Sequence, residues 1–228
     1  MRRSPLFWPL TLPFLLVLVV LFLVLLGLVQ VGALVYAYER IGISRTWLFT
    51  LLAVSILGSA VNLPVARLRE VVVVAPHVVR VFGVRYLVPR VRQRRQTVIG
   101  VNLGGALVPA AVAGYLIVRD GLGMRALLAV GIVGAVSFLL ARPVPGVGIV
   151  LPGLIPPIVA ALAALVIAEQ VAPALAYVSG VLGTLVGADL LNLPRIRRLG
   201  APVASIGGAG TFDGIFLSGL IAVLIASL

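Results

Sequence analysis

Residues 173–198 read PALAYVSGVLGTLVGADLLNLPRIRR and decide the fold class. From Pro173 to Leu193 the stretch is almost entirely apolar, with one acidic residue, Asp189, before a cluster of arginines. About 20 apolar residues cross the hydrocarbon core of a bilayer as a helix, and arginines collect where such helices reach the cytoplasm. The stretch therefore predicts a transmembrane helix that ends at the cytoplasmic surface.

The whole 228-residue chain shares this character. Hydrophobic residues make up 62% and charged residues 11% of it, whereas soluble domains have about 45–50% and about 25%. The sequence predicts an all-α, polytopic transmembrane helical bundle of seven spans, which forms one domain over residues 1–228. The predicted spans are 12–38, 47–66, 97–118, 124–141, 156–171, 173–193 and 205–227.

All 18 basic residues are arginines, and their positions predict an orientation. Arg40, Arg45, Arg119 and Arg125 fall on one side of the seven spans, and the other arginines fall on the opposite side. The positive-inside rule then puts the amino terminus in the cytoplasm and the carboxyl terminus outside the inner (plasma) membrane. The arginines border membrane spans and have few aromatic residues among them, which disfavours nucleic acid as a partner.

The residue inventory removes most kinds of catalytic chemistry. The chain has no cysteine and no lysine, which excludes thiol nucleophiles, cysteine metal sites and Schiff bases. Its single histidine, His77, stands among valines without the partners of a catalytic triad, and we interpret it as a solvated loop residue. We expect no metal and no cofactor, so carboxylates are the candidate catalytic groups.

Two parts of the chain resemble each other. Asn-Leu-Pro occurs at 62–64 and at 192–194, each time before arginines at the end of a predicted span. A glycine-rich entry into the next span follows at 100–105 and at 207–214. One interpretation is a duplicated three-span unit, which gives parallel repeats. The other is that this pattern is a common way to end a span at the cytoplasmic surface.

Under the duplication, the two units are residues 12–118 and 156–227. Asn62 and Asn102 of the first unit then correspond to Asp189 and Asp213 of the second.

Residues 70–96 form the largest segment predicted outside the membrane. Their β-branched runs, with a turn at Gly83, predict a cytoplasmic β-hairpin. Its arginines would attract anionic lipid headgroups at about 1 kcal/mol each, and a free strand edge could pair with an extended peptide. The arginines concerned are Arg90, Arg92, Arg94 and Arg95.

A second irregular segment, 142–157, is rich in proline and glycine and yet apolar. It predicts a re-entrant or cavity-lining segment, or a loop folded over the helix ends.

Asp189 and Asp213 lie well inside apolar stretches. Carrying a carboxylate into hydrocarbon costs about 2.5–3.5 kcal/mol, so an acid in such a place is a functional candidate by default. Asp189 precedes Arg195 by about 9 Å of helix, and Asp213 follows Ser205 by about 12 Å. On adjacent antiparallel helices, two carboxylates at similar depth would share one proton.

Two structural roles remain open for these acids. Asp213 could be the N-cap of a helix that starts there. Asp189 could form a buried ion pair with Arg195 or Arg198.

Four motifs spread over most of the chain: Gly-Val-Asn-Leu-Gly-Gly at 100–105, Pro-Val-Pro-Gly at 143–146, Gly-Ala-Asp at 187–189 and Gly-Thr-Phe-Asp-Gly at 210–214. In these the chain resembles an uncharacterised prokaryotic multi-pass membrane family, a domain of unknown function. That resemblance implies a membrane fold and no particular activity.

A local pattern surrounds the acids. Gly208-Ala209-Gly210 stands before Asp213 with two residues between, and Pro173-Ala174-Leu175 stands before both acids. This is similar to the presenilin and signal-peptide-peptidase group of intramembrane aspartyl proteases, in which Pro-Ala-Leu follows the acids. The resemblance implies that Asp189 and Asp213 are catalytic. It also implies substrate contacts from Gly208, Gly210, Gly214, Pro173, Ala174 and Leu175.

Three functions are compatible with the sequence. The first is a hydrolase that cleaves transmembrane peptides with the two aspartates. The second is a proton- or cation-coupled transporter that uses the same acids, with Asn62, Asn102 and Asn192 as additional polar lining. The third is a lipid-binding or assembly factor that uses the arginine-rich hairpin. The oligomeric state is left open.

Overall fold

The computed structural model describes residues 8–74, 77–81, 84–88, 91–144, 148–196, 203–208 and 214–228. Its helices are α1 (Trp8–Arg40), α2 (Arg45–Gly58), α3 (Val108–Arg119), α4 (Gly123–Leu140), α5 (Ile155–Ile167), α6 (Ala172–Thr184), α7 (Leu193–Ile196) and α8 (Gly214–Ala226). Its strands are β1 (Asn62–Val74), β2 (His77–Val81), β3 (Val84–Val88), β4 (Val91–Asn102), β5 (Arg142–Val144), β6 (Gly148–Val150) and β7 (Val203–Ile206). Two π-helical turns, η1 (Leu103–Leu107) and η3 (Leu185–Leu190), and a 3₁₀ turn, η2 (Glu169–Val171), complete the described elements.

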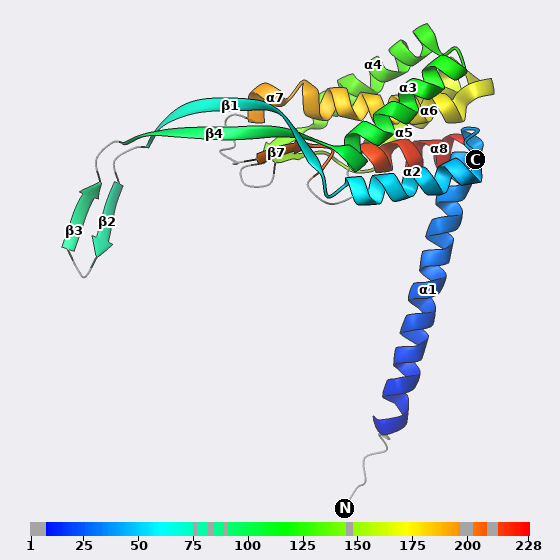
Figure 1. Ribbon diagram of the computed structural model, residues 1–228, viewed down its shortest axis with the longest axis horizontal. Helices are drawn as coiled ribbons and strands as arrows, with labels where there is room; N and C mark the ends of the chain where they lie inside the picture. Colours follow the sequence, from blue (N-terminus) through cyan, green and yellow to red (C-terminus); the bar gives the residue numbers. More distant parts are fainter. Residues whose placement is uncertain are drawn as a thin grey trace, which may run out of the picture.

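The core of the molecule is a helical bundle in which α6 is the central element (Figure 1). Helix α6 packs against α3, α4, α5 and α8, and nearly all of its residues are buried. Small residues allow this packing: a Cβ on Gly180 would lie 2.9 Å from the backbone carbonyl oxygen of Ser218 in α8. Close helix contacts through small residues are typical of membrane bundles. Helix α1 meets the bundle at its carboxyl-terminal end, where Arg40 donates to the Ser227 carbonyl, and projects away from it.

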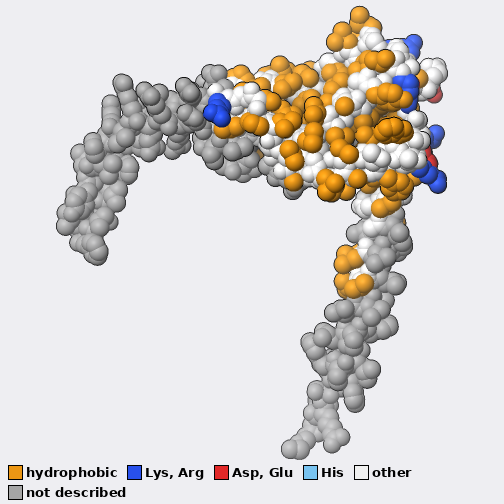
Figure 2. All heavy atoms as spheres, in the orientation of Figure 1, with side chains coloured by type: hydrophobic (Ala, Val, Ile, Leu, Met, Phe, Trp, Pro, Cys, Tyr) orange, Lys and Arg blue, Asp and Glu red, His pale blue; other side chains and the backbone are white. Residues whose placement is uncertain are grey.

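The surface of the bundle is apolar between two charged ends (Figure 2). Large hydrophobic side chains such as Val118, Leu139 and Val166 are about four-fifths exposed, at 83%, 78% and 86%. At one end lie Glu39, Arg40, Arg45, Arg119 and Asp120. A surface of this kind indicates contact with lipid along the middle of the bundle.

Within the described residues, two helical stretches have the length and composition to cross a membrane: Gly123–Leu140 and Ile155–Arg195. A third is added if Val29–Arg40 and Arg45–Gly58, which are bent by 118° relative to each other, count as one span. Leu103–Arg119 and Gly214–Ala226 are apolar but shorter. We conclude that the molecule is a mostly helical membrane protein.

The prediction of seven full spans is not supported. Each predicted span contains a helix, but several of these helices are shorter than predicted. Residues 62–66 and 97–102 were assigned to spans and belong instead to strands β1 and β4, and residues 203–206 form strand β7. By hydropathy, the apolar, β-branched sequence at 97–101 suits a strand and a helix equally. Its strand structure depends on pairing with distant segments, which the local sequence does not reveal.

The predicted hairpin at 70–96 is part of a longer one. Strand β1 pairs antiparallel with β4 from Asn62↔Asn102 to Val74↔Val91, and β2 pairs with β3 beyond them. Of the arginines predicted to bind headgroups, Arg92, Arg94 and Arg95 belong to β4, and Arg90 lies outside the described residues. The hairpin extends away from the bundle (Figure 1).

The sheet also joins the two halves of the chain. Its order is β1-β4-β7, and β7 runs parallel to β4 with Val101 opposite Ile206. Both strands lead through glycines towards a helix, β4 into η1 and α3, and β7 towards α8. This arrangement is compatible with the predicted parallel repeat, which stays a prediction.

Candidate functional site around Asp189

Asp189 lies in the π-helical turn η3, which continues α6. A close approach of two backbones accompanies this turn: a Cβ on Gly187 would lie only 2.1 Å from the carbonyl oxygen of Gly134 in α4. Only glycine at 187 allows α4 to come so near. Single π turns inside α-helices change the direction of nearby side chains and occur often at functional sites.

Asp189 is half-buried and lines a cavity of about 270 Å³. The cavity wall comes from three parts of the chain: Ile149, Val150 and Leu151 from the β5–β6 hairpin and its exit, Thr184, Ala188 and Asp189 from α6 and η3, and Gly214 and Ile215 from α8. The segment 142–157 thus contributes to the lining of a cavity, which was one of the two alternatives for it.

Hydroxyl groups add polarity next to this cavity. The buried Thr184 hydroxyl, on the same helix as Asp189, hydrogen bonds to the Ser218 hydroxyl of α8 at 3.2 Å. Sequence reasoning did not select Thr184 or Ser218, although hydroxyl residues within apolar stretches are a signal that could have identified them. Together with the Asp189 carboxyl group, they place three polar side chains near η3.

The second predicted acid, Asp213, lies outside the described residues, as does Gly210. Its predicted depth assumed a helix running from Ser205, and this assumption is wrong because Ser205 belongs to strand β7. Helix α8 begins at Gly214, the residue after Asp213 in the chain, and Gly214 lines the same cavity as Asp189.

The Asn192 side chain binds the backbone at the carboxyl-terminal end of η3. It is fully buried, and its side-chain amide donates to the carbonyl oxygens of Gly187 and Ala188, both at 3.0 Å. Its amide oxygen accepts from Arg195 at 2.8 Å, and the Arg195 guanidinium lies 4.9 Å from the centre of the Phe138 ring. Asn192 therefore satisfies carbonyl groups that the irregular turn leaves without helical partners.

Asn62 and Asn102 are brought together, as opposite residues of β1 and β4. The Asn102 amide donates to the Asn62 side-chain oxygen at 3.2 Å and to the Ser59 carbonyl at 2.7 Å, while its oxygen accepts from the Gly105 backbone N–H at 2.7 Å. The Ser205 hydroxyl of β7 donates to the Asn62 oxygen. These contacts tie the first half of the chain to the second.

The remaining predicted site residues do not gather around Asp189. Ala174 and Leu175 are buried and Pro173 is half-buried in the first turn of α6. They precede Asp189 by 14 residues or more, which corresponds to about 20 Å of helix. Gly208 follows β7 with φ of 84°, a conformation that favours glycine, and its carbonyl lies within hydrogen-bonding distance of the Ser205 hydroxyl.

Comparison with protein families gives one result. A family model described as a protein of unknown function, DUF1614, matches residues 56–225, which is most of the chain. The chain belongs to the DUF1614 family. The match covers all four motifs that carried the resemblance to an uncharacterised membrane family, and that prediction is confirmed. No curated protein and no solved structure matches this DUF1614 protein.

Proposed function

We propose that this DUF1614 protein is an intramembrane hydrolase that uses Asp189 and Asp213 as a catalytic pair and cleaves transmembrane peptides. One observation carries the proposal: Asp189 and Gly214, the residue that follows Asp213, line the same cavity. The irregular turn η3 supports it, because π turns inside α-helices are frequent at functional sites.

The chemistry needs two carboxyl groups in different protonation states. Two acids that face one cavity ionise in separate steps, so that one is a carboxylate while the other keeps its proton. The carboxylate takes a proton from a water as that water attacks the peptide carbonyl, and the protonated partner donates a hydrogen bond to the carbonyl oxygen. The tetrahedral intermediate then collapses: the C–N bond breaks, the first carboxyl group gives the amine the proton that it took from the water, and the partner keeps its own proton.

A peptide must be extended to be cut, and strand β7 offers a place to hold it. Within the described sheet β7 pairs only with β4, so its other edge is free to accept a further strand. Strand β7 leads through Gly207 and Gly208 towards α8, whose first residue lines the cavity. A substrate strand on β7 would thus lie on the segment that leads to the proposed second acid.

Proton- or cation-coupled transport is the second candidate. The cavity volume of about 270 Å³ favours it, because sites for larger ligands are usually about 300–1,000 Å³. Interrupted helices around a buried carboxylate are also common in transporters.

We further propose the orientation with the amino terminus in the cytoplasm. It is supported by the grouping of Arg40, Arg45 and Arg119 at the bundle end opposite to η3, as the arginine pattern requires. The inner membrane and the seven-helix arrangement, with several helices entering the bilayer without crossing it fully, belong to the same proposal.

The test is cleavage of a reconstituted transmembrane peptide by the purified full chain in liposomes. Asp189→Asn and Asp213→Asn should each abolish cleavage, while Glu169→Gln, which removes a charge from the α5–α6 turn, should not. If no peptide is cut, and an imposed proton gradient instead drives uptake of a solute into the liposomes that depends on Asp189, the protein is a transporter and not a hydrolase. Unchanged behaviour of both asparagine variants in both assays would show that the acids are structural.

A further inference from the structure

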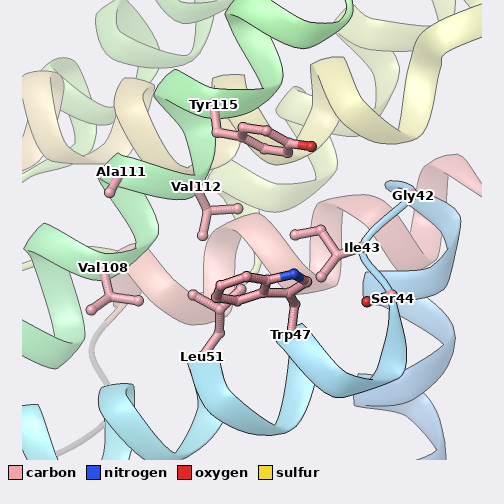
Figure 3. Close-up of a pocket in the computed structure, with 9 residues that line it drawn as sticks. All are labelled: Gly42, Ile43, Ser44, Trp47, Leu51, Val108, Ala111, Val112 and Tyr115. Carbon is pink, nitrogen blue, oxygen red and sulfur yellow. The ribbon is translucent and has the colours of Figure 1, made fainter.

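An apolar groove lies between α2 and α3, and it shares no lining residue with the cavity at Asp189. Its volume is about 670 Å³. Trp47 and Leu51 line it from α2, Val108, Ala111, Val112 and Tyr115 from α3, and Gly42, Ile43 and Ser44 from the turn before α2 (Figure 3). The groove opens onto the bundle surface, since the Trp47 side chain is 65% and the Tyr115 side chain 56% exposed.

The groove has a polar and an apolar end. In Figure 3 the Tyr115 hydroxyl, the Trp47 ring nitrogen and the Ser44 hydroxyl lie towards the Gly42 turn, whereas Leu51 and Val108 lie at the opposite end. Tyrosine and tryptophan prefer this situation at the membrane interface, with the ring in apolar surroundings and the polar atom near the headgroups. The groove therefore matches an amphiphile in polarity.

Two guanidinium groups stand at the polar end. Arg119 lies 5.4 Å from the centre of the Tyr115 ring and donates to the Gly42 carbonyl at 3.2 Å. Arg45 directly follows Ser44, and its side chain is 73% exposed while it pairs with Glu39. The Arg119 side chain is 29% exposed and already pairs with Asp120 at 2.6 Å. The more exposed Arg45 is therefore the group that can bind a phosphate, because arginine donates several hydrogen bonds in one plane.

The size of the groove favours a lipid acyl chain over a partner helix as its occupant. Four turns of an α-helix about 10 Å across occupy roughly 1,700 Å³, more than twice the volume of the groove, about 670 Å³. A flexible acyl chain is narrower and can follow the groove from its polar end into its apolar end.

We propose that this groove binds one glycerophospholipid, with an acyl chain between α2 and α3 and the phosphate at the turn that holds Ser44 and Arg45. The site is independent of the function proposed for Asp189. The acyl chain would fill the space between α2 and α3, which make few direct contacts with each other.

Tryptophan fluorescence can test this, because the chain has two tryptophans and Trp8→Phe leaves Trp47 as the reporter. The Trp8→Phe protein in detergent micelles is titrated with a phosphatidylcholine brominated in mid-chain, which quenches tryptophan on contact. Quenching should saturate at about one lipid per chain, as expected for a single specific site.

Two further substitutions, on the same helix, decide the result. Ala111→Phe fills the groove from an exposed position and should weaken the lipid affinity at least about tenfold, or about 1.4 kcal/mol. Val118→Phe adds a similar volume at a residue that is 83% exposed and does not line the groove, and it should leave the titration unchanged.

The proposal is overturned if quenching rises in proportion to the lipid fraction, with the same slope in both variants, since that result describes random contact. It is equally overturned if a crosslinker on the groove joins two copies of the chain in lipid-free micelles, because the occupant is then protein.

Discussion

The turns η1 and η3 have the same local structure and different roles. The sequence Leu-Gly-Gly-Ala-Leu forms η1 and Leu-Val-Gly-Ala-Asp-Leu forms η3, and both are π-helical. Both press a glycine against a neighbouring backbone: a Cβ on Gly104 would lie 1.9 Å from the Ser55 carbonyl oxygen, and one on Gly187 2.1 Å from that of Gly134. The packing device is therefore shared.

The polar residue beside each turn makes the difference. Beside η1 the fully buried Asn102 is neutral and bound to Ser59, Asn62 and Gly105. Within η3 the half-buried Asp189 faces a cavity. The amide network therefore holds η1 in place, whereas the carboxyl group beside the cavity gives η3 an ionisable side chain. Substitution of Asn102 should therefore mainly change stability, and substitution of Asp189 should mainly change activity.

The largest expected effect comes from the carboxylate itself. Asp189→Asn keeps the shape of the side chain and removes its acid chemistry, so turnover of a transmembrane peptide should fall at least about 100-fold. The melting temperature in detergent should stay within about 3 °C, since a change below about 1 kcal/mol is expected in a chain of this size. A variant that unfolds instead would assign Asp189 to the structure.

The shared packing device is tested next, by Gly104→Ala and Gly187→Ala. Each added methyl group meets backbone oxygen, which cannot move away as a flexible side chain can. We expect each variant to lose about 2–3 kcal/mol, measured as the loss of monodisperse protein after heating in detergent. Gly114→Ala and Gly131→Ala are the matched controls, because a Cβ at either position meets nothing within 4 Å. Equal stability of all four proteins would contradict the close approaches.

The amide network gives the third prediction. Asn102→Ala leaves the Ser59 carbonyl and the Gly105 N–H without their side-chain partner, and an unsatisfied buried group costs about 1–3 kcal/mol. The variant should melt about 3–8 °C lower and keep the activity of the folded fraction. A loss of activity without a loss of stability would place Asn102 in the functional site, as the predicted correspondence with Asp213 would have it.

Local features of the sequence predicted what depends on local physics. Helix α4 was expected at 124–141 and is found at Gly123–Leu140, because an apolar run between a turn and Arg142 determines it without help from distant residues. Asp189 stood out because a carboxylate in an apolar stretch is costly wherever the chain places it.

Features that depend on distant contacts were missed. Thr97–Asn102 was expected to be helical, and its strand structure comes from pairing with residues 62–68 and with β7, more than 100 residues away. The turn η3 depends on the close approach of Gly187 to Gly134, and the hydrogen-bond network at Asn62 includes the distant Ser205 hydroxyl. Neither contact has a signature in the sequence next to it, so periodicity and hydropathy could not reveal them.

The smallest expected effect separates two buried hydroxyl groups, one beside each turn. Ser218→Ala removes the partner of the Thr184 hydroxyl next to the Asp189 cavity and should cost about 0.5–1.5 kcal/mol. Ser55→Ala, beside η1, removes a buried hydroxyl that has no hydrogen-bond partner among the described residues, and it should be neutral or slightly stabilising. Thermal melts of the two variants in the same detergent provide the measurement. A larger loss of stability in Ser55→Ala than in Ser218→Ala would contradict this expectation, because it would mean that the Ser55 hydroxyl beside η1 makes the stronger hydrogen bond.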